Sequence, residues 1–104
     1  MQKYTYYAVF EPSTDGSYGV YWPDLPGCTS WGENLPRAQE MAKEALTLHL
    51  SQMIEDGDRL PVSQVPSGGN TVSRYNPVMP VTVFVDANTG KFNTGRAARQ
   101  YATA

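Results

Sequence analysis

The pattern of hydrophobic positions at the start of the chain predicts a hairpin whose first strand is apolar on both faces. Residues 4–10 read YTYYAVF, so the even-numbered side chains share one face of a strand and the odd-numbered ones share the other. Residues 12–17 contain Asp15-Gly16, which supplies the positive φ that a tight hairpin turn requires. Residues 18–22 are aromatic and β-branched, and we expect them to return as a second strand.

A rigid corner follows the second strand. Pro23, Pro26 and Gly27 interrupt any regular ladder, because proline fixes φ and has no amide donor. Residues 28–32 then resume a strand pattern. The first three strands are therefore predicted to form an antiparallel meander.

The next segment has helical periodicity from Asn34 to about Asp56. Asn34 is suited to cap the free amides, Pro36 is tolerated in a first turn, and Gly57 is suited to a left-handed stop. One face of this helix collects small and apolar side chains, which suggests close packing against a sheet. That predicted face consists of Ala38, Ala42, Ala45, Leu46, His49 and Met53.

Beyond the helix, residues 61–77 are rich in Pro, Ser, Gly and Asn and predict an irregular connection. Residues 78–85 (VMPVTVFV) predict a fourth strand, which Pro80 restricts to an edge or a bulge. The expected fold is α+β: a three- to four-stranded, mainly antiparallel sheet with one long helix packed on one face. We assign residues 1–86 to this domain, including the connection. Residues 87–104 form a basic tail with a short helix near its end.

One helix can cover only one face of such a sheet. The other face is predicted to expose Tyr7 and Val9, together with either Phe84 or the three valines that alternate with it. An apolar patch of more than a few hundred Å² usually marks an interface. We favour a protein interface, the alternative being that the connection at 61–77 and the tail fold over this face.

Composition narrows the class of protein. The 104 residues suffice for one domain, 40% are hydrophobic and 17% are charged, as in ordinary globular proteins. No apolar run reaches the ~20 residues of a membrane helix, and the N-terminus lacks a signal core. The single cysteine fits a reducing compartment, and we expect a cytoplasmic protein without membrane association.

Charge is unevenly distributed. Residues 1–86 carry all ten carboxylates and five Lys/Arg, a net charge of −5, whereas residues 87–104 carry three cations and no acid. An acidic body is a poor general ligand for nucleic acid, because that affinity comes largely from neutralising phosphates. The basic tail is a solvated terminus or a phosphate contact.

Catalytic and metal-binding signals are weak. His49 is the sole histidine and lies within the predicted apolar arc, and Cys28 is interpreted as a small buried residue. One His and one Cys cannot form a zinc site. Glu11, Asp24 and Asp86 lie near strand ends, where a metal-dependent nuclease would need them, but all three equally suit turns. We therefore expect no enzyme activity, no cofactor and no metal.

The order of these motifs resembles the HicB family of antitoxins. The resemblance rests on WPDLPGC at 22–28, on AxxxAxxALxLHL at 38–50 and on EDGDxLPVS at 55–63. It covers roughly residues 4–66 and the strand at 78–85. It implies a partial ribonuclease-H-like fold without catalytic acids, acting by binding and blocking a small basic RNA-cleaving HicA toxin. Many such proteins also carry a C-terminal DNA-binding segment, for which the nineteen residues after Val85 are too few.

The leading hypothesis is accordingly a non-catalytic antitoxin-like module, forming a homodimer or higher oligomer, that contacts a HicA-like toxin. The predicted partner-binding residues are Tyr7, Tyr21, Trp22, Asp24, Trp31 and Glu33. The alternative is an RNA-binding module or orphan regulatory domain, with strand aromatics stacking on bases. Its predicted phosphate contacts are Lys91, Arg96 and Arg99.

Overall fold

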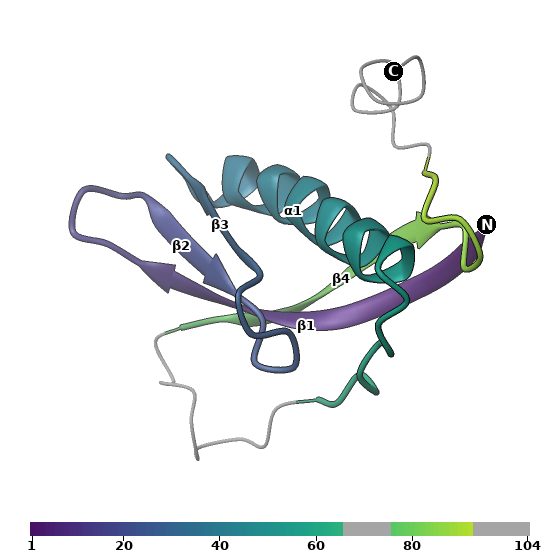
Figure 1. Cartoon of the computed structure of the whole chain (residues 1–104). Helices are drawn as coiled ribbons and strands as arrows, with labels where there is room; N and C mark the ends of the chain where they lie inside the picture. The colour runs from purple at the N-terminus through teal and green to yellow at the C-terminus, as the bar shows by residue number, and fades with distance from the viewer. Residues whose placement is uncertain (66–75, 93–104) are drawn as a thin grey trace.

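Four strands form one sheet in the computed structural model of the chain, which describes residues 1–65 and 76–92 (Figure 1). The strands are β1 (Gln2–Pro12), β2 (Tyr18–Tyr21), β3 (Thr29–Gly32) and β4 (Val78–Val85). Their order across the sheet is β3-β2-β1-β4, and every neighbouring pair is antiparallel. The predicted meander and the α+β class are confirmed.

The β1–β2 hairpin closes through the predicted Asp15-Gly16 turn. Gly16 has a φ of +90°. The Asp15 carboxylate accepts hydrogen bonds from the Ser17 backbone N–H at 3.0 Å and from the Ser17 hydroxyl at 2.6 Å. These bonds favour the ionised form and lower the pKa of Asp15. The turn thus carries a fixed negative charge at neutral pH.

β4 lies at the edge of the sheet, as Pro80 predicts. Its register with β1 runs from Gln2↔Val85 to Val9↔Val78, and the Phe10 N–H donates to the Pro77 carbonyl at 2.9 Å. Since hydrogen-bonded pairs alternate in an antiparallel ladder, the even-numbered residues of β4 direct their backbone groups to the outer edge. Pro80 therefore removes no bond to β1.

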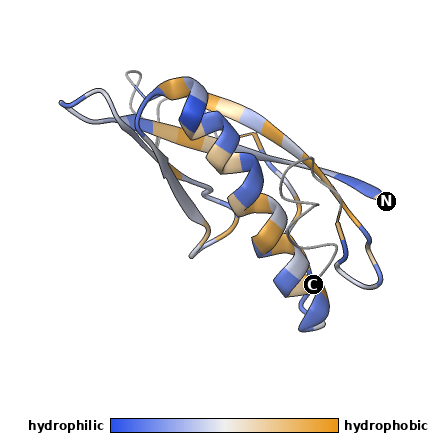
Figure 2. Cartoon of the chain, turned by 90° about the horizontal axis from the view of Figure 1, so that it is seen from above, coloured by the Kyte–Doolittle hydropathy of each residue, from blue (hydrophilic) through white to orange (hydrophobic). Residues whose placement is uncertain are grey.

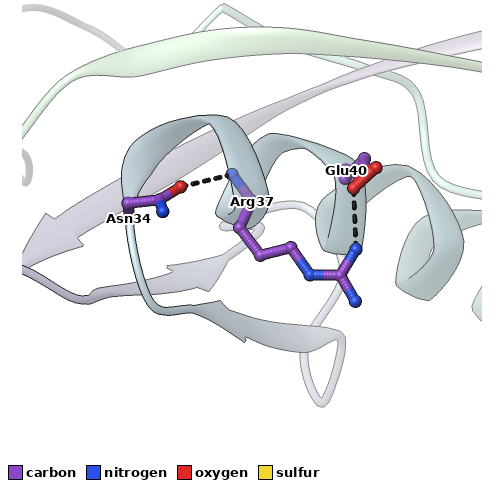
Figure 3. A network of polar contacts seen from close by, with 3 residues as sticks. All are labelled: Asn34, Arg37 and Glu40. Atoms are coloured by element: carbon purple, nitrogen blue, oxygen red, sulfur yellow. Dashed lines mark hydrogen bonds and ion pairs between the residues drawn. The ribbon is translucent and has the colours of Figure 1, made fainter.

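The helix α1 (Leu35–Glu55) begins and ends where the capping residues predict. The Asn34 side chain accepts from the Arg37 N–H at 2.9 Å (Figure 3). Arg37 also forms an ion pair with Glu40 at 2.7 Å, but both side chains are about half exposed, so the pair adds little stability. Gly57, with a φ of +76°, terminates the helix.

The buried face of α1 is rotated relative to the prediction. Ala38, Ala42, Leu46 and Leu50 are fully buried at four-residue intervals, whereas the predicted members His49, Met53 and Ala45 are only partly buried. The buried face also includes two polar residues, and the hydroxyl of each has a hydrogen-bond acceptor. The Thr47 hydroxyl donates to the Lys43 carbonyl at 2.7 Å, and the Ser51 hydroxyl donates to the Gly90 carbonyl at 2.6 Å.

The hydrophobic core fills the space between α1 and one face of the sheet. It contains alternate residues of β1 and β4 together with the corner that follows β2. Gly32 marks the tightest approach, because a Cβ there would lie under 3.0 Å from backbone atoms of Arg37 and Ala38. Figure 2 shows hydrophilic and hydrophobic residues alternating around α1, consistent with one buried and one solvated side.

Beyond β4 the chain turns back toward α1. Asp86 N–H donates to the Lys91 carbonyl at 2.7 Å, and Phe92 forms a bridge to Val85. Gly90 adopts a φ of +78° beneath the end of the helix. The predicted short helix in the tail lies outside the described residues. Within those residues, no helix has the length and apolar character needed to span a bilayer.

Candidate protein-binding face

The strand register divides the sheet into a core face and a second face that α1 does not cover, called the open face below. On β1, Tyr6, Ala8 and Phe10 belong to the core, so the odd-numbered residues turn to the open face. A hydrogen bond of 2.8 Å between the Thr5 and Thr82 hydroxyls confirms that these positions share a side. The open face comprises Lys3, Thr5, Tyr7, Val9, Glu11, Gly19, Tyr21, Thr29, Trp31, Val78, Pro80, Thr82 and Phe84.

Large aromatic side chains are exposed on the open face. Trp31 is 57% exposed and Phe84 is 47% exposed, while Tyr7 and Tyr21 are half-buried. The structure thus decides between the two predicted faces of β4: Phe84 is outward, and the three valines belong to the core. The prediction that Val9 is exposed is wrong. Val9 is fully buried, because it lies on the central strand between Tyr21 and Val78.

Three of the predicted partner-binding aromatics, Tyr7, Tyr21 and Trp31, are brought onto the same face. Trp22 is not. It follows β2, is 2% exposed and packs in the core with Leu25 and Cys28, so its assignment as a contact residue is wrong. Its side chain lies on the same side as Val20, two residues earlier, and the chain turns directly after it, where the Leu25 N–H donates to the Trp22 carbonyl at 3.1 Å. Among the described residues, its indole N–H has no hydrogen-bond partner.

The two predicted acidic contacts lie apart from the aromatics. Asp24 is partly buried in the corner loop, where its carboxylate accepts from the Gln64 N–H at 2.9 Å. It therefore holds the chain after α1 in place, assisted by the Tyr6 hydroxyl, which donates to the Pro61 carbonyl at 2.5 Å. Glu33 is exposed immediately after β3.

Glu11 is a residue of the open face that the sequence-based set of contacts did not include. Glu11 is exposed and pairs in register with Gly19, which pairs in turn with Trp31. From the sequence it was considered as a metal ligand or as a turn former. The strand alternation from Tyr7 through Val9 to Glu11 was the available signal, since it already placed Glu11 on the face opposite Phe10.

Of the residues predicted to contact phosphate in the RNA-binding alternative, only some lie in the part of the chain that the structure describes. Lys91 is exposed in the turn after β4. Arg96 and Arg99 lie outside the described residues. Lys91 is therefore separated from the half of the open face that carries Trp31, because β4 and β3 occupy opposite edges of the sheet.

A pocket also lies between α1 and the edge strand β4. The residues lining it are Phe10, Gln39, Lys43, Met79, Pro80 and Val81. Gln39 bridges its two walls by donating to the Met79 sulfur at 3.1 Å.

The groups with catalytic potential are held in structural roles. Burial raises the pKa of Cys28 to about 12, so its thiol stays protonated near neutrality. The Asp86 carboxylate accepts from the Asn88 and Thr89 N–H groups at 2.8 and 2.9 Å, as a turn former does, and these bonds lower its pKa. Across residues 1–65 and 76–92, no three His, Cys, Asp or Glu side chains are grouped to hold a metal ion.

Comparison with known sequences identifies a family. The family described as HicB_like antitoxin of bacterial toxin-antitoxin system matches residues 6–97. Antitoxin HicB 1 of Photorhabdus laumondii subsp. laumondii is 33% identical over 86 residues, which cover 79% of this chain and 55% of that protein. An uncharacterised 14.9 kDa protein of Haemophilus phage HP1 is 47% identical over 53 residues, 51% of this chain and 39% of the phage protein. The chain thus spans roughly half the length of these relatives.

Solved structures share the fold. A chain from a toxin–antitoxin complex of Streptococcus pneumoniae superposes with a TM-score of 0.66 and 23% identity, over 80% of this chain and 70% of that one. The N-terminal domain of the Burkholderia pseudomallei antitoxin HicB superposes with a TM-score of 0.58 and 26% identity, over 80% of this chain and 99% of that domain. The arrangement of α1 on the sheet is therefore one that antitoxin domains adopt.

Proposed function

The chain belongs to the HicB-like antitoxins of bacterial toxin–antitoxin systems, and on this basis we propose that it neutralises a HicA-like toxin by binding it. The toxin expected from the family resemblance is a small, basic, RNA-cleaving protein. The chain acts as a non-catalytic binding module, and the open face of its sheet is the surface that meets the toxin.

The observation that carries this proposal is the exposed aromatic surface of the open face. A side chain such as Trp31, 57% exposed on a strand, contributes little to the stability of the isolated chain. Aromatic residues of this kind are enriched among the residues that dominate binding energy at protein interfaces. Trp31 and Phe84 lie near opposite ends of the face, with Tyr21 and Tyr7 between them.

Charge supports the choice of partner. The four strands and the two connections between β1 and β3 contain only one cation, Lys3, against the carboxylates Glu11, Asp15 and Asp24. Complementary charge speeds encounter with a basic protein and disfavours wrong partners. The same carboxylates would repel RNA phosphates, so the RNA-binding alternative is not favoured.

Self-association and cellular location belong to the same proposal. We infer a homodimer or higher oligomer, because Trp31 and Phe84 are both exposed on strands at opposite edges of the sheet, which leaves apolar surface at each edge. A cytoplasmic location fits the unpaired, buried thiol of Cys28 and a toxin that acts on RNA.

The test is co-expression with the short reading frame adjacent to the gene, followed by purification of the complex. Rescue from toxicity and a co-purifying protein are the expected results. Trp31→Ala should weaken the complex by at least about 2 kcal/mol, the loss typical of an aromatic residue that dominates an interface. The matched control is Leu48→Ala, which removes an exposed apolar side chain from α1 on the other side of the sheet. Equal affinities of both variants and wild type would reject the open face as the toxin-binding surface.

A further inference from the structure

One row across the open face combines an aromatic ring, an open space and a carboxylate. Glu11, Gly19 and Trp31 are in register on β1, β2 and β3. Neighbouring strands lie about 4.8 Å apart, so the backbones of Trp31 and Glu11 are separated by roughly 10 Å. Gly19, between them, has no side chain, and a Cβ placed on it would meet no atom within 4 Å. Among residues 1–65 and 76–92, no atom therefore fills the position directly above the Gly19 backbone, at the centre of the row.

Both side chains that border this space are available. Trp31 is the most exposed aromatic residue of the sheet. The exposed Glu11 carboxylate has no ion pair and no hydrogen bond with any residue the structure describes. Tyr21, two residues along β2 from Gly19, borders the space on a third side and is only half-buried.

The space has the dimensions and chemistry of a receptor for a cationic side chain. A guanidinium attracts an indole ring when it lies over the ring face, within about 6 Å of its centre. It is also planar, with donors that match a carboxylate in a bidentate arrangement. A guanidinium inserted above Gly19 would contact the Trp31 ring on one side and the Glu11 carboxylate on the other.

The surrounding charges favour a cation and disfavour a nucleic-acid base. Asp15 follows Glu11 through the hairpin turn, and Glu33 follows Trp31 directly after β3. Lys3, the one cation within the strands, pairs with Phe84 at the far end of β1. A base stacked on Trp31 would bring its phosphate toward these carboxylates, whereas an arginine or lysine would be attracted by them.

We propose that the space over Gly19, between Trp31 and Glu11, receives an arginine side chain of the basic toxin. The proposal rests on the antitoxin function proposed above and adds the chemistry of the contact. Trp31 supplies the ring on which the guanidinium stacks, Glu11 accepts its hydrogen bonds, and Gly19 leaves the room that both contacts need.

The first experiment measures the affinity of the co-expressed toxin for variants of the three residues. Glu11→Gln and Trp31→Leu should each weaken binding about tenfold or more, within the range expected for a partly desolvated cation–π and ion-pair contact. Gly19→Val should weaken binding to a similar extent by filling the space, although it touches neither contact group. Glu55→Gln is the matched control, because it removes the same charge from an exposed carboxylate of α1 on the other side of the sheet, and it should bind as wild type. Circular dichroism verifies that each variant is folded.

The second experiment needs no toxin. Nuclear magnetic resonance follows the Trp31 indole N–H and the Gly19 amide during titration with a tetra-arginine peptide and, separately, with a single-stranded uridine oligonucleotide. The peptide should shift both signals in wild type, and the shifts should disappear in Gly19→Val and Glu11→Gln. Trp31→Phe assigns the indole signal.

The outcomes separate the two proposals. Failure to recover any toxin complex would contradict the proposed function, while the peptide titration would still test the cation site. A stable complex whose affinity is unchanged in Glu11→Gln and Gly19→Val would overturn the arginine site and leave the antitoxin function standing. A shift of Trp31 by the oligonucleotide but not by the peptide would overturn it in favour of RNA stacking.

Discussion

Replacing Gly32 by alanine should destabilise the protein strongly, because Gly32 marks where α1 begins over β3. The added Cβ would lie under 3.0 Å from three backbone atoms of Arg37 and Ala38. Backbone atoms cannot rotate away as a side chain can, so either the strand or the first turn of α1 must shift. Overpacking of this kind costs typically 1–3 kcal/mol, and we expect a value near the upper end, about 3 kcal/mol.

This loss is large for a chain of 104 residues, whose total stability is on the order of 5–15 kcal/mol. It corresponds to a fall in melting temperature of roughly 12–24 °C, at about 4–8 °C per kcal/mol. Thermal and urea unfolding followed by far-ultraviolet circular dichroism measure it.

Gly19→Ala is the matched control for this substitution. Gly19 pairs with Trp31 in the row next to Gly32, and its Cβ would meet open space. Its stability should be unchanged or raised by up to about 1 kcal/mol, because alanine reduces the entropy of the unfolded chain. Similar melting temperatures for both variants would show that α1 does not approach β3 at Gly32, and the division into core and open faces would be wrong.

Three further predictions concern the cap, the C-terminal turn and the buried thiol. Asn34→Ala should cost about 1 kcal/mol in chemical denaturation by removing the cap on the Arg37 amide, and Asn34→Ser should restore most of it. Ser51→Ala should cost about 1–3 kcal/mol, because it leaves the buried Gly90 carbonyl without its donor; an unchanged urea midpoint would contradict this role. Burial raises the pKa of Cys28 from 9.0 to about 12, so the unfolded chain loses this proton first as pH rises. The stability that the buried thiol contributes should be intact below pH 9 and fall between pH 9 and about 12. In a pH series of urea midpoints, Cys28→Ala should flatten this part of the curve. An equally steep fall in that variant would show that the thiol is not the cause.

The elements of this fold follow from local signals in the sequence. The structure confirms the first strand over residues 4–10, the Asp15-Gly16 turn, the Asn34 cap and the Gly57 stop, each of which depends on a short stretch of sequence. Pro80 placed β4 at an edge, because the restriction on a proline is set by its own missing donor.

Details of burial were harder to predict. Thr47 and Ser51 read as polar positions, and their burial depends on acceptors at Lys43 and Gly90. Gly90 is far from the helix in sequence and meets it only in the folded protein. The hydrophobic periodicity of the helix could not include that contact, so it favoured a buried face centred too far toward His49 and Met53. Trp22 was expected to be a contact together with its neighbour Tyr21, although consecutive strand residues face opposite sides; Trp22 lies on the same side as Val20, in the core.

The sequence predicted several residues of the candidate site, but it did not predict which of them lie side by side across the strands. Tyr7, Tyr21 and Trp31 were predicted as partner contacts, and the strand register places all three on one face. The row formed by Glu11, Gly19 and Trp31 depends on the register of three strands, which turn lengths and packing fix together. A shift of one residue in the register of β1 with β2, or of β2 with β3, would have removed this row.

The most direct test of the central claim is hydroxyl-radical footprinting of the purified toxin complex, read by mass spectrometry against the chain alone. Oxidation of Trp31, Tyr21 and Tyr7 should fall strongly in the complex, while Met41 and Leu48 on α1 should react as in the free chain. Protection confined to α1, with Trp31 still reactive, would contradict the claim that the open face binds the toxin.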